Sequence, residues 1–136
     1  MGLKGIYLYV FRIKNRKINV GALGEIYFDG LYAYVGSDQR CLEKRIARHR
    51  RKEKKKRWHI DYVTPYAEEG VAFCLYLPKN FEEKLSNFLA ERYEVVEKFG
   101  SSDLPNCKGN LFKVDENIGI VIKQFAKMYG AEVVIL

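Results

Sequence analysis

Five side chains in this sequence carry the groups that cleavage of a phosphodiester bond requires. Tyr7 and Tyr34 supply hydroxyls, Arg45 a guanidinium, His49 an imidazole and Glu82 a carboxylate. The reaction needs a proton acceptor for the nucleophile, a cation that balances charge on the phosphorane oxygens and, commonly, a metal ion held by a carboxylate. Tyrosine is an unusual general base because its ordinary pKa is about 10, so a metal-bound water and nearby cations would have to assist it.

Arg45 and His49 are four residues apart in a predicted helix that begins at about Cys41 and continues into a basic run. Leu42 and Ile46 have the same spacing, so the two polar side chains lie on the side of the apolar stripe. A charge at the edge of a buried face needs a partner or a ligand. Two explanations remain open, a phosphate site or an internal pair between Arg45 and a carboxylate.

The positive charge of the chain is concentrated in one segment. Of its 24 Lys and Arg residues, 11 lie between positions 40 and 57, whereas the rest of the chain holds 13 basic and 15 acidic residues. Such a cluster indicates a polyanion partner, although a solvated helix face gives the same pattern. We expect eight of these side chains to bind nucleic acid: Arg48, Arg50, Arg51, Lys52, Lys54, Lys55, Lys56 and Arg57.

The elements that must position these groups are predicted as an α/β (α+β) fold of one domain, residues 1–136, with a small, mainly antiparallel sheet flanked by about three helices. β-branched and aromatic residues predict a strand at residues 5–13. Asn15-Arg16 and Asp29-Gly30 read as turns. The first 36 residues therefore predict a meander whose further strands are residues 18–20, 26–28 and 31–35.

The second half of the chain predicts alternating elements. Asn80 and Glu83 form a capping-box pattern at the start of a helix, in which Glu82 is on the apolar side. Trp58–Tyr62, read as a strand, places His59 and Asp61 on one side, but their role stays open. The remaining predictions are a strand at residues 71–77, a long polar loop at 100–110, a strand at 111–114, a helix at about 116–129 ended by Gly130, and a strand at 132–136.

Three short motifs in the first half of the chain resemble the GIY-YIG nuclease superfamily. They are Gly5-Ile6-Tyr7, Tyr34-Val35-Gly36 and Leu42-x-x-Arg45-x-x-x-His49. Trp58–Tyr62 and Phe99–Asp103 resemble, in particular, a subfamily that is sometimes fused to an endonuclease III-like glycosylase. The loop after Gly100 departs from that subfamily, because Leu104 and Asn110 interrupt its pattern.

The resemblance implies a metal-dependent endonuclease, a phosphodiester hydrolase that uses Mg²⁺ or Mn²⁺. Tyr7 and Tyr34 would be the two motif tyrosines, and Gly5 and Gly36 the motif glycines. Arg45 would bind the scissile phosphate and His49 would assist or position. Glu82 would be the metal ligand, and Glu83 and Glu91 compete with it for that role.

Other functions fit the same sequence. The first alternative is a catalytically inactive nucleic-acid-binding module of the same fold, and the next is a protein-interaction domain with a solvated basic helix. The resemblance favours DNA over RNA as the partner and suggests a DNA-repair protein as a second one. Without a membrane-length apolar run or a secretory segment, and with three separated cysteines, Cys41, Cys74 and Cys107, the sequence predicts a cytoplasmic protein with reduced thiols and no membrane partner.

Overall fold

The computed structural model describes residues 2–68, 70–96, 99 and 109–136. Six strands form one antiparallel sheet in the order β4-β5-β2-β1-β3-β6. The strands are β1 (Gly5–Asn19), β2 (Glu25–Asp38), β3 (Val71–Leu75), β4 (Glu94–Val95), β5 (Leu111–Val114) and β6 (Val133–Ile135). The predicted small α+β fold with an antiparallel sheet is therefore confirmed.

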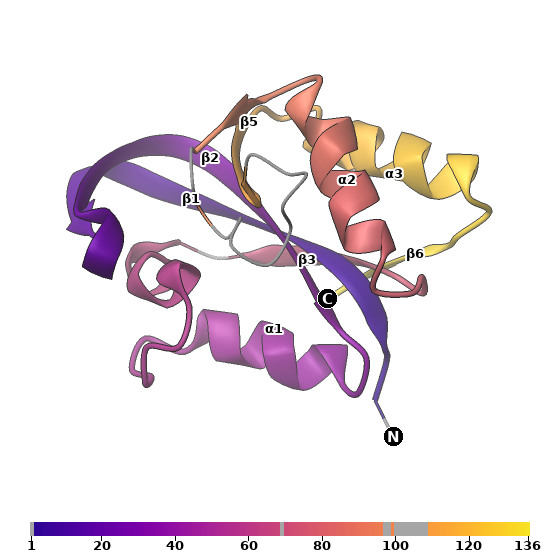
Figure 1. Ribbon diagram of the computed structural model, residues 1–136, viewed down its shortest axis with the longest axis horizontal. Coiled ribbons are helices and arrows are strands. Elements are labelled where there is room, and N and C mark those ends of the chain that lie inside the picture. The colour runs from indigo at the N-terminus through magenta and orange to yellow at the C-terminus, as the bar shows by residue number, and fades with distance from the viewer. Residues whose placement is uncertain (1, 69, 97–98, 100–108) are drawn as a thin grey trace.

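Helices cover both faces of the sheet (Figure 1). The α-helix α1 packs on one face, and α2 and α3 pack on the other. Alternation along β1 supplies both cores, because successive side chains of a strand point to opposite faces. The helices are α1 (Leu42–Arg50), α2 (Phe81–Ala90) and α3 (Ile118–Met128), with short 3₁₀ turns η1 (Gly21–Leu23), η2 (His59–Tyr62) and η3 (Thr64–Tyr66).

The predicted meander is instead one long hairpin of β1 and β2 (Figure 1). The two turns expected at Asn15-Arg16 and Asp29-Gly30 are wrong, since both dipeptides lie within the strands. The pairing register shifts between Ile13 and Arg16, and the Asn15 backbone N–H donates to Asp29 Oδ1 at 3.2 Å. The turn-forming residues therefore produce a β-bulge, which bends a strand without ending it.

One further local prediction is wrong. Helix α1 ends at Arg50, so it enters the basic run as predicted, and residues 51–57 lie outside the helix. Trp58–Tyr62 contains the 3₁₀ turn η2 in place of a strand, and Asp61 is fully buried there, whereas His59 is half-buried. A single charged side chain needs close donors when it is buried, and the tight turn supplies them: the backbone N–H groups of Arg57 and Trp58 donate to Asp61 Oδ2 at 2.8 and 3.1 Å.

The C-terminal half follows the predictions with small changes. Helix α2 starts at Phe81, but Asn80 makes no side-chain capping hydrogen bond, so the expected capping box is absent at this position. The short strand β4 was not predicted, and Gly130 follows α3 with a positive φ of 65°. Of the predicted loop 100–110, only Gly109 and Asn110 belong to the described residues.

Within the described ranges, every helix is too short or too polar to cross a membrane. Cys41 and Cys74 are free thiols, and burial raises the pKa of Cys74 to about 11. Cys107 lies outside the described residues.

Candidate functional site

The two strands of the hairpin bring the two motif tyrosines together. Tyr7 pairs with Gly36 across β1 and β2, and the rings of Tyr7 and Tyr34 are 6.5 Å apart between centroids. Gly36 is required here for space, because a Cβ at this position would overlap the hydroxyl end of the fully buried Tyr7 ring. Its φ is not in the left-handed region, so the requirement is steric and not conformational.

Gly5, the other motif glycine, has a different structural reason. It opens β1 with a φ of 145°, a backbone conformation that side chains disfavour. A Cβ on Gly5 would also overlap the backbone carbonyl oxygen of Leu75 on β3. The glycine thus lets β1 enter the centre of the sheet directly beside β3.

Helix α1 presents His49 to the Tyr7 hydroxyl. Tyr7 Oη and His49 Nε2 share a buried hydrogen bond of 2.7 Å, and the imidazole stacks on the Tyr9 ring at 5.1 Å. Burial, with smaller contributions from Lys54 and Arg45, lowers the pKa of His49 to about 3. His49 is therefore neutral at physiological pH, and it can position the Tyr7 hydroxyl without carrying a charge.

The surroundings of Tyr7 also favour its neutral form. Burial raises the pKa of Tyr7 well above the ordinary value, and the charges of Tyr34 and Glu82 act in the same direction. Arg45 opposes them by charge and by hydrogen bonding, so its guanidinium is close enough to influence this hydroxyl. Tyr7 is consequently a protonated hydroxyl at neutral pH, and its ionisation would need further positive charge.

Arg45 has an internal carboxylate partner and also contacts an aromatic ring. Its Nη2 lies 3.3 Å from Asp38 Oδ2, and its guanidinium lies over the Trp58 ring, 4.5 Å from the centroid. Both members of the ion pair are partly exposed, with 25% and 19% of the side-chain surface accessible. The pair is an internal one, as one alternative predicted, but it leaves the guanidinium at a cavity wall where a ligand can reach it.

A cavity of about 510 Å³ joins most of the predicted site. Tyr34, Gly36, Arg45 and Glu82 all line it, although they come from β2, α1 and α2. Neither Tyr7 nor His49 is among the described residues that line it, because both are buried behind the wall. The remaining lining residues are Ala22, Ser37, Lys56, Arg57, Trp58, His59, Ile60, Tyr62, Lys79, Phe99 and Asn110.

Glu82 is the carboxylate that lines the cavity. Ser37 Oγ donates to Glu82 Oε2 at 3.1 Å, which fixes the side chain at the start of α2. Glu83 does not line the cavity, and Glu91 lies beyond it, 3.5 Å from its neighbour Arg92. Of the three glutamates considered as metal ligands, Glu82 alone lines the cavity together with Arg45.

The donor set suits only one type of metal ion. Among the described residues, no three His, Cys, Asp or Glu side chains gather closely enough to hold a metal by themselves. Mg²⁺ binds in many sites through one or two carboxylates, keeping several waters and contacting substrate phosphates. One wall-lining carboxylate therefore fits Mg²⁺ or Mn²⁺ held jointly with a ligand, and does not fit a structural zinc site.

The basic run divides into two groups. Four of the eight predicted nucleic-acid-binding side chains have internal partners. Arg48 Nη2 lies 2.7 Å from the buried Asp61 Oδ2, and Arg50 Nη2 donates to the backbone of Gly70 and Leu136. Lys52 and Lys54 also donate to backbone carbonyls, and burial lowers the pKa of Lys54 to about 8.

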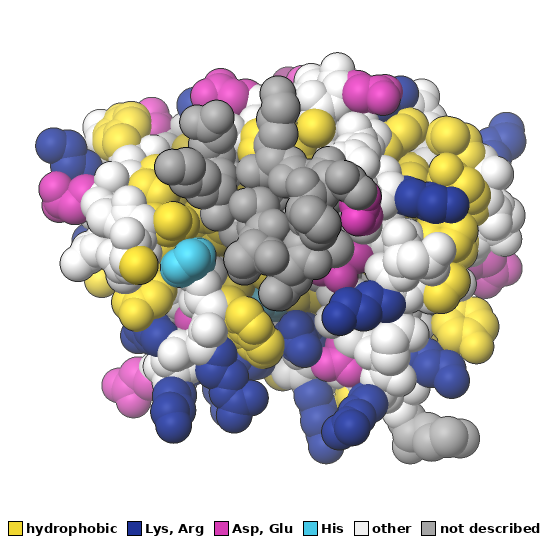
Figure 2. All heavy atoms as spheres, in the orientation of Figure 1, with side chains coloured by type: hydrophobic (Ala, Val, Ile, Leu, Met, Phe, Trp, Pro, Cys, Tyr) yellow, Lys and Arg dark blue, Asp and Glu magenta, His cyan; other side chains and the backbone are white. Residues whose placement is uncertain are grey.

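The other four basic side chains, Arg51, Lys55, Lys56 and Arg57, are exposed, and the last two also line the cavity. Arg50 and Lys52 are exposed as well, although they donate to backbone carbonyls. Figure 2 shows Lys and Arg side chains gathered along the lower edge of this face, over α1 and the segment after it. The exposed basic surface is therefore continuous with the cavity through Lys56 and Arg57.

Three residues of this site were not predicted from the sequence. Asp38 and Ser37 fix Arg45 and Glu82, and Lys79 adds a cation to the cavity. The only signal for the first two was their position directly after the Tyr34-Val35-Gly36 motif. Trp58 was noted only as part of a motif, and its contact with Arg45 could not be read from a spacing of 13 residues.

Comparison with known proteins identifies the domain but no relative of known function. A family model described as "Domain of unknown function DUF123" matches residues 6–131. No curated protein and no solved structure matches the chain. The matched range covers nearly all of the sheet and all three α-helices. The chain therefore belongs to the family of the domain of unknown function DUF123.

Proposed function

We propose that this domain is a metal-dependent endonuclease of the GIY-YIG type, which cleaves phosphodiester bonds in nucleic acid, in DNA more than in RNA. One observation carries the proposal. Tyr34, Gly36, Arg45 and Glu82 are spread over 49 positions, yet all four line one cavity. A hydroxyl, a guanidinium and a carboxylate that face a common space are the groups that phosphodiester cleavage needs.

Arg45 binds the scissile phosphate. Its guanidinium is held from two sides, by Asp38 and by the Trp58 ring, so its direction is fixed before a ligand arrives. A pre-oriented cation stabilises the charge that develops on the phosphorane oxygens without paying for reorganisation during the reaction. Because Arg guanidinium groups stay protonated at all physiological pH values, this function does not depend on pH.

Tyr34 would accept the proton of the nucleophile as a phenolate, because the buried Tyr7 is already protonated. The Tyr34 side chain lines the cavity, so its oxygen is the one that contacts the attacking water. Arg45, which lines the same cavity, and a bound divalent ion would favour the ionised form. Tyr7 is buried behind Tyr34 and hydrogen-bonded to His49, so Tyr7 orients and polarises the tyrosine pair from within. This assigns contact with the nucleophile to Tyr34, and a positioning function to Tyr7 and His49.

Glu82, held by Ser37, would be the protein ligand of Mg²⁺ or Mn²⁺. Such an ion, when bound, lowers the pKa of its water and neutralises charge on the phosphate. The exposed residues Arg51, Lys55, Lys56 and Arg57 contact the nucleic-acid backbone. Phosphate contacts carry no sequence information, so we expect weak sequence preference and affinity that falls steeply with salt.

A nicking assay on supercoiled plasmid tests the proposal. The wild-type chain is expected to convert the plasmid to its open-circular form with Mg²⁺ or Mn²⁺ and not with EDTA. Glu82→Ala should lose this activity, whereas the neighbouring Glu83→Ala and the exposed Glu91→Ala serve as matched controls and should keep it. Equal activity in all four proteins would contradict the assignment of Glu82.

A second function, a nucleic-acid-binding module without catalysis, has one observation in its favour. Glu82 is the only acidic residue among the described residues that line the cavity, and many metal nucleases would use more than one. If the chain is such a module, the wild-type protein would bind plasmid but would not nick any substrate with any divalent metal. It would act in partnership with a DNA-repair protein. A protein-interaction domain, the remaining alternative, would not be retained on nucleic acid at moderate salt.

A further inference from the structure

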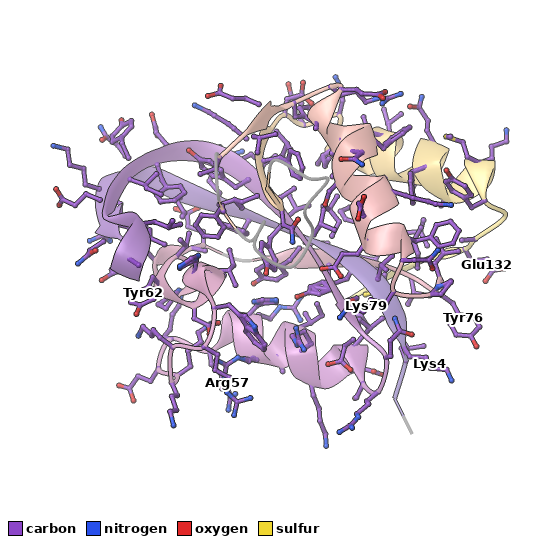
Figure 3. The ribbon with its side chains drawn as sticks, viewed as in Figure 1. Lys4, Arg57, Tyr62, Tyr76, Lys79 and Glu132 are labelled. Carbon is purple, nitrogen blue, oxygen red and sulfur yellow. The ribbon has the colours of Figure 1, made fainter. Side chains whose placement is uncertain are left out.

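The cavity has two ends that are built from different chemistry. Gly36, Ser37, Lys79 and Glu82 form a small, charged end beside the start of α2. The other end lies beside η1 and η2 and consists largely of rings and an aliphatic side chain: Ala22, Trp58, His59, Ile60, Tyr62 and Phe99. Figure 3 shows this separation, with Tyr62 toward the left of the view and Lys79 toward the right, below α2.

The aromatic end is accessible and has a defined shape. Trp58, His59 and Tyr62 are half-buried, so each keeps surface to offer to a ligand. Phe99 is fully buried and packs edge-on against the His59 ring, with centroids 6.1 Å apart, which fixes one wall. Three half-buried rings in one concave place would gain free energy from further burial. A stacked ligand would provide that burial.

Two of the three half-buried rings, Trp58 and Tyr62, have a cation next to them. Arg45 lies over Trp58, and the ammonium group of Lys56 lies 6.0 Å from the centre of the Tyr62 ring. Arg57 lines the same space, and no acidic residue among the described ones does so at this end. A ligand that fits must therefore combine a flat, stackable group with negative charge, which is the composition of a nucleotide.

We propose that the aromatic end of the cavity stacks an unpaired nucleobase beside the phosphate that Arg45 binds. Protein aromatic side chains hold single-stranded nucleic acid in this way, without regard to base identity. A base inside a duplex is stacked on both sides, so it can enter a cavity only after it has left the stack. The substrate class is consequently single-stranded or locally unpaired nucleic acid, and the position of the base relative to the cut bond rests on the proposed endonuclease function.

Trp58 makes the proposal directly measurable, since it is the only tryptophan in the chain. The probes are a single-stranded DNA 12-mer of thymidines, an abasic 12-mer with the same phosphates, and a blunt duplex. Titrations are made in EDTA, so that binding is observed without cutting. Stacking predicts that the thymidine strand quenches Trp58 fluorescence and binds at least about fivefold more tightly than the abasic strand, since one stacked base contributes ~1–3 kcal/mol.

A pair of tyrosine variants separates the cavity from the general surface. Tyr62→Ala is expected to remove most of the preference for the thymidine strand over the abasic strand. Tyr76→Ala, which changes a ring with 75% exposure outside this cavity, should keep the preference. Circular dichroism checks that both variants fold. Tyr62→Phe keeps the ring and removes the hydroxyl, so it should retain the preference for the thymidine strand if the preference comes from stacking.

The outcomes distinguish this proposal from the endonuclease itself. Equal affinity for the thymidine and abasic strands, with no quenching of Trp58 by either, would overturn base stacking even in a chain that nicks plasmid. Quenching that is specific to the thymidine strand, together with the expected loss in Tyr62→Ala, would support base stacking even in a chain that never cuts. A blunt duplex that quenches Trp58 as strongly as the thymidine strand would overturn the preference for unpaired substrates.

Discussion

The two faces of the sheet are packed with different chemistry. The face under α2 and α3 is closed mainly by Ile, Leu, Val, Phe and Ala side chains that need no hydrogen-bond partner. Its buried polar contact is uncharged: Ser86 Oγ donates to Asn110 Oδ1 at 3.3 Å. The face under α1 buries the rings of Tyr7, Tyr9 and Tyr32 together with the polar side chains of His49 and Asp61. Both faces are equally inaccessible to water, so burial alone does not distinguish them.

The difference suggests separate functions for the two faces: the α2 and α3 face stabilises the fold, and the α1 face positions the side chains of the candidate site. Apolar burial stabilises without conditions, whereas a buried polar group is costly unless each donor and acceptor is matched. On the α1 face the matching is partial: the Tyr7–His49 hydrogen bond and the Arg48–Asp61 ion pair engage His49 Nε2 and Asp61 Oδ2. Within the described part of the chain, His49 Nδ1, Asp61 Oδ1 and Arg48 Nε are buried without a hydrogen-bond partner. The cavity opens at the edge of this polar packing, and four predictions test whether the two faces separate in function as they do in composition.

The largest effect is expected on the apolar face. Phe125 is 1% exposed and contacts the rings of Phe88 and Tyr129 at 5.2 and 5.0 Å. Phe125→Ala should lower the free energy of unfolding by ~3–5 kcal/mol, measured by urea denaturation. Ile120→Ala on the same helix, at 60% exposure, is the control and should change it by less than ~0.5 kcal/mol. Nicking per folded molecule should stay unchanged in both, and a selective loss in Phe125→Ala would break the separation of the faces.

The next effect is on catalysis from the polar face. Arg45→Ala should slow nicking by ~10²–10³, or about 2.7–4 kcal/mol of activation free energy, the range seen when one oriented donor is removed. Stability should fall by no more than ~1 kcal/mol, because the ion pair with Asp38 is partly exposed. Lys44→Ala, an exposed position on the same helix, is the control. Equal losses of DNA affinity and nicking in Arg45→Ala would argue against a dedicated catalytic function.

A matched pair of glycine substitutions compares the faces directly. Gly36→Ala forces a methyl group against the buried Tyr7 ring, and overpacking of this kind destabilises by ~1–3 kcal/mol. Gly119 on α3 has room for a Cβ, with Phe73 Cζ at 3.8 Å, and no positive φ. Gly119→Ala should therefore stabilise the chain by ~0.5–1 kcal/mol. Thermal unfolding measures both, and a stable, active Gly36→Ala protein would refute the close approach of Tyr7 and Gly36.

The smallest effect is a pH dependence of the free energy of unfolding, which we expect from His49 on the polar α1 face. His49 remains neutral in the folded chain down to about pH 3, whereas an unfolded histidine takes up a proton below about pH 6.5. Between these values the unfolded state binds more protons, so the free energy of unfolding should fall by up to ~1.4 kcal/mol for each pH unit below about 6.5. Urea denaturation from pH 7.5 to 5 measures this slope. His49→Gln should reduce it, and an identical slope in that variant would assign it to another group.

Much of the fold could be predicted from local patterns. The alternation in β1, the apolar stripes of α2 and α3, and Gly130 after α3 each follow from rules that act over a few residues. The errors arose where one local signal serves two structures. Asn15 and Gly30 suit a turn and also a bulge, and only the pairing of two long strands selects the bulge. Asn80 has the sequence of a cap, yet its backbone is helical and its side chain makes no capping bond.

The amino-acid sequence by itself determined which groups this protein has for chemistry and the two strands and helix that carry most of them. It did so because residue types, glycines and four-residue spacings act locally. Tertiary structure decided which groups share a cavity. Tyr34 lies at its wall and Tyr7 is buried behind it, and Glu82, not Glu83, lines it together with Arg45. Tertiary structure also decided that half of the basic run has internal partners, because burial and ion pairing depend on segments that meet only when the chain has folded.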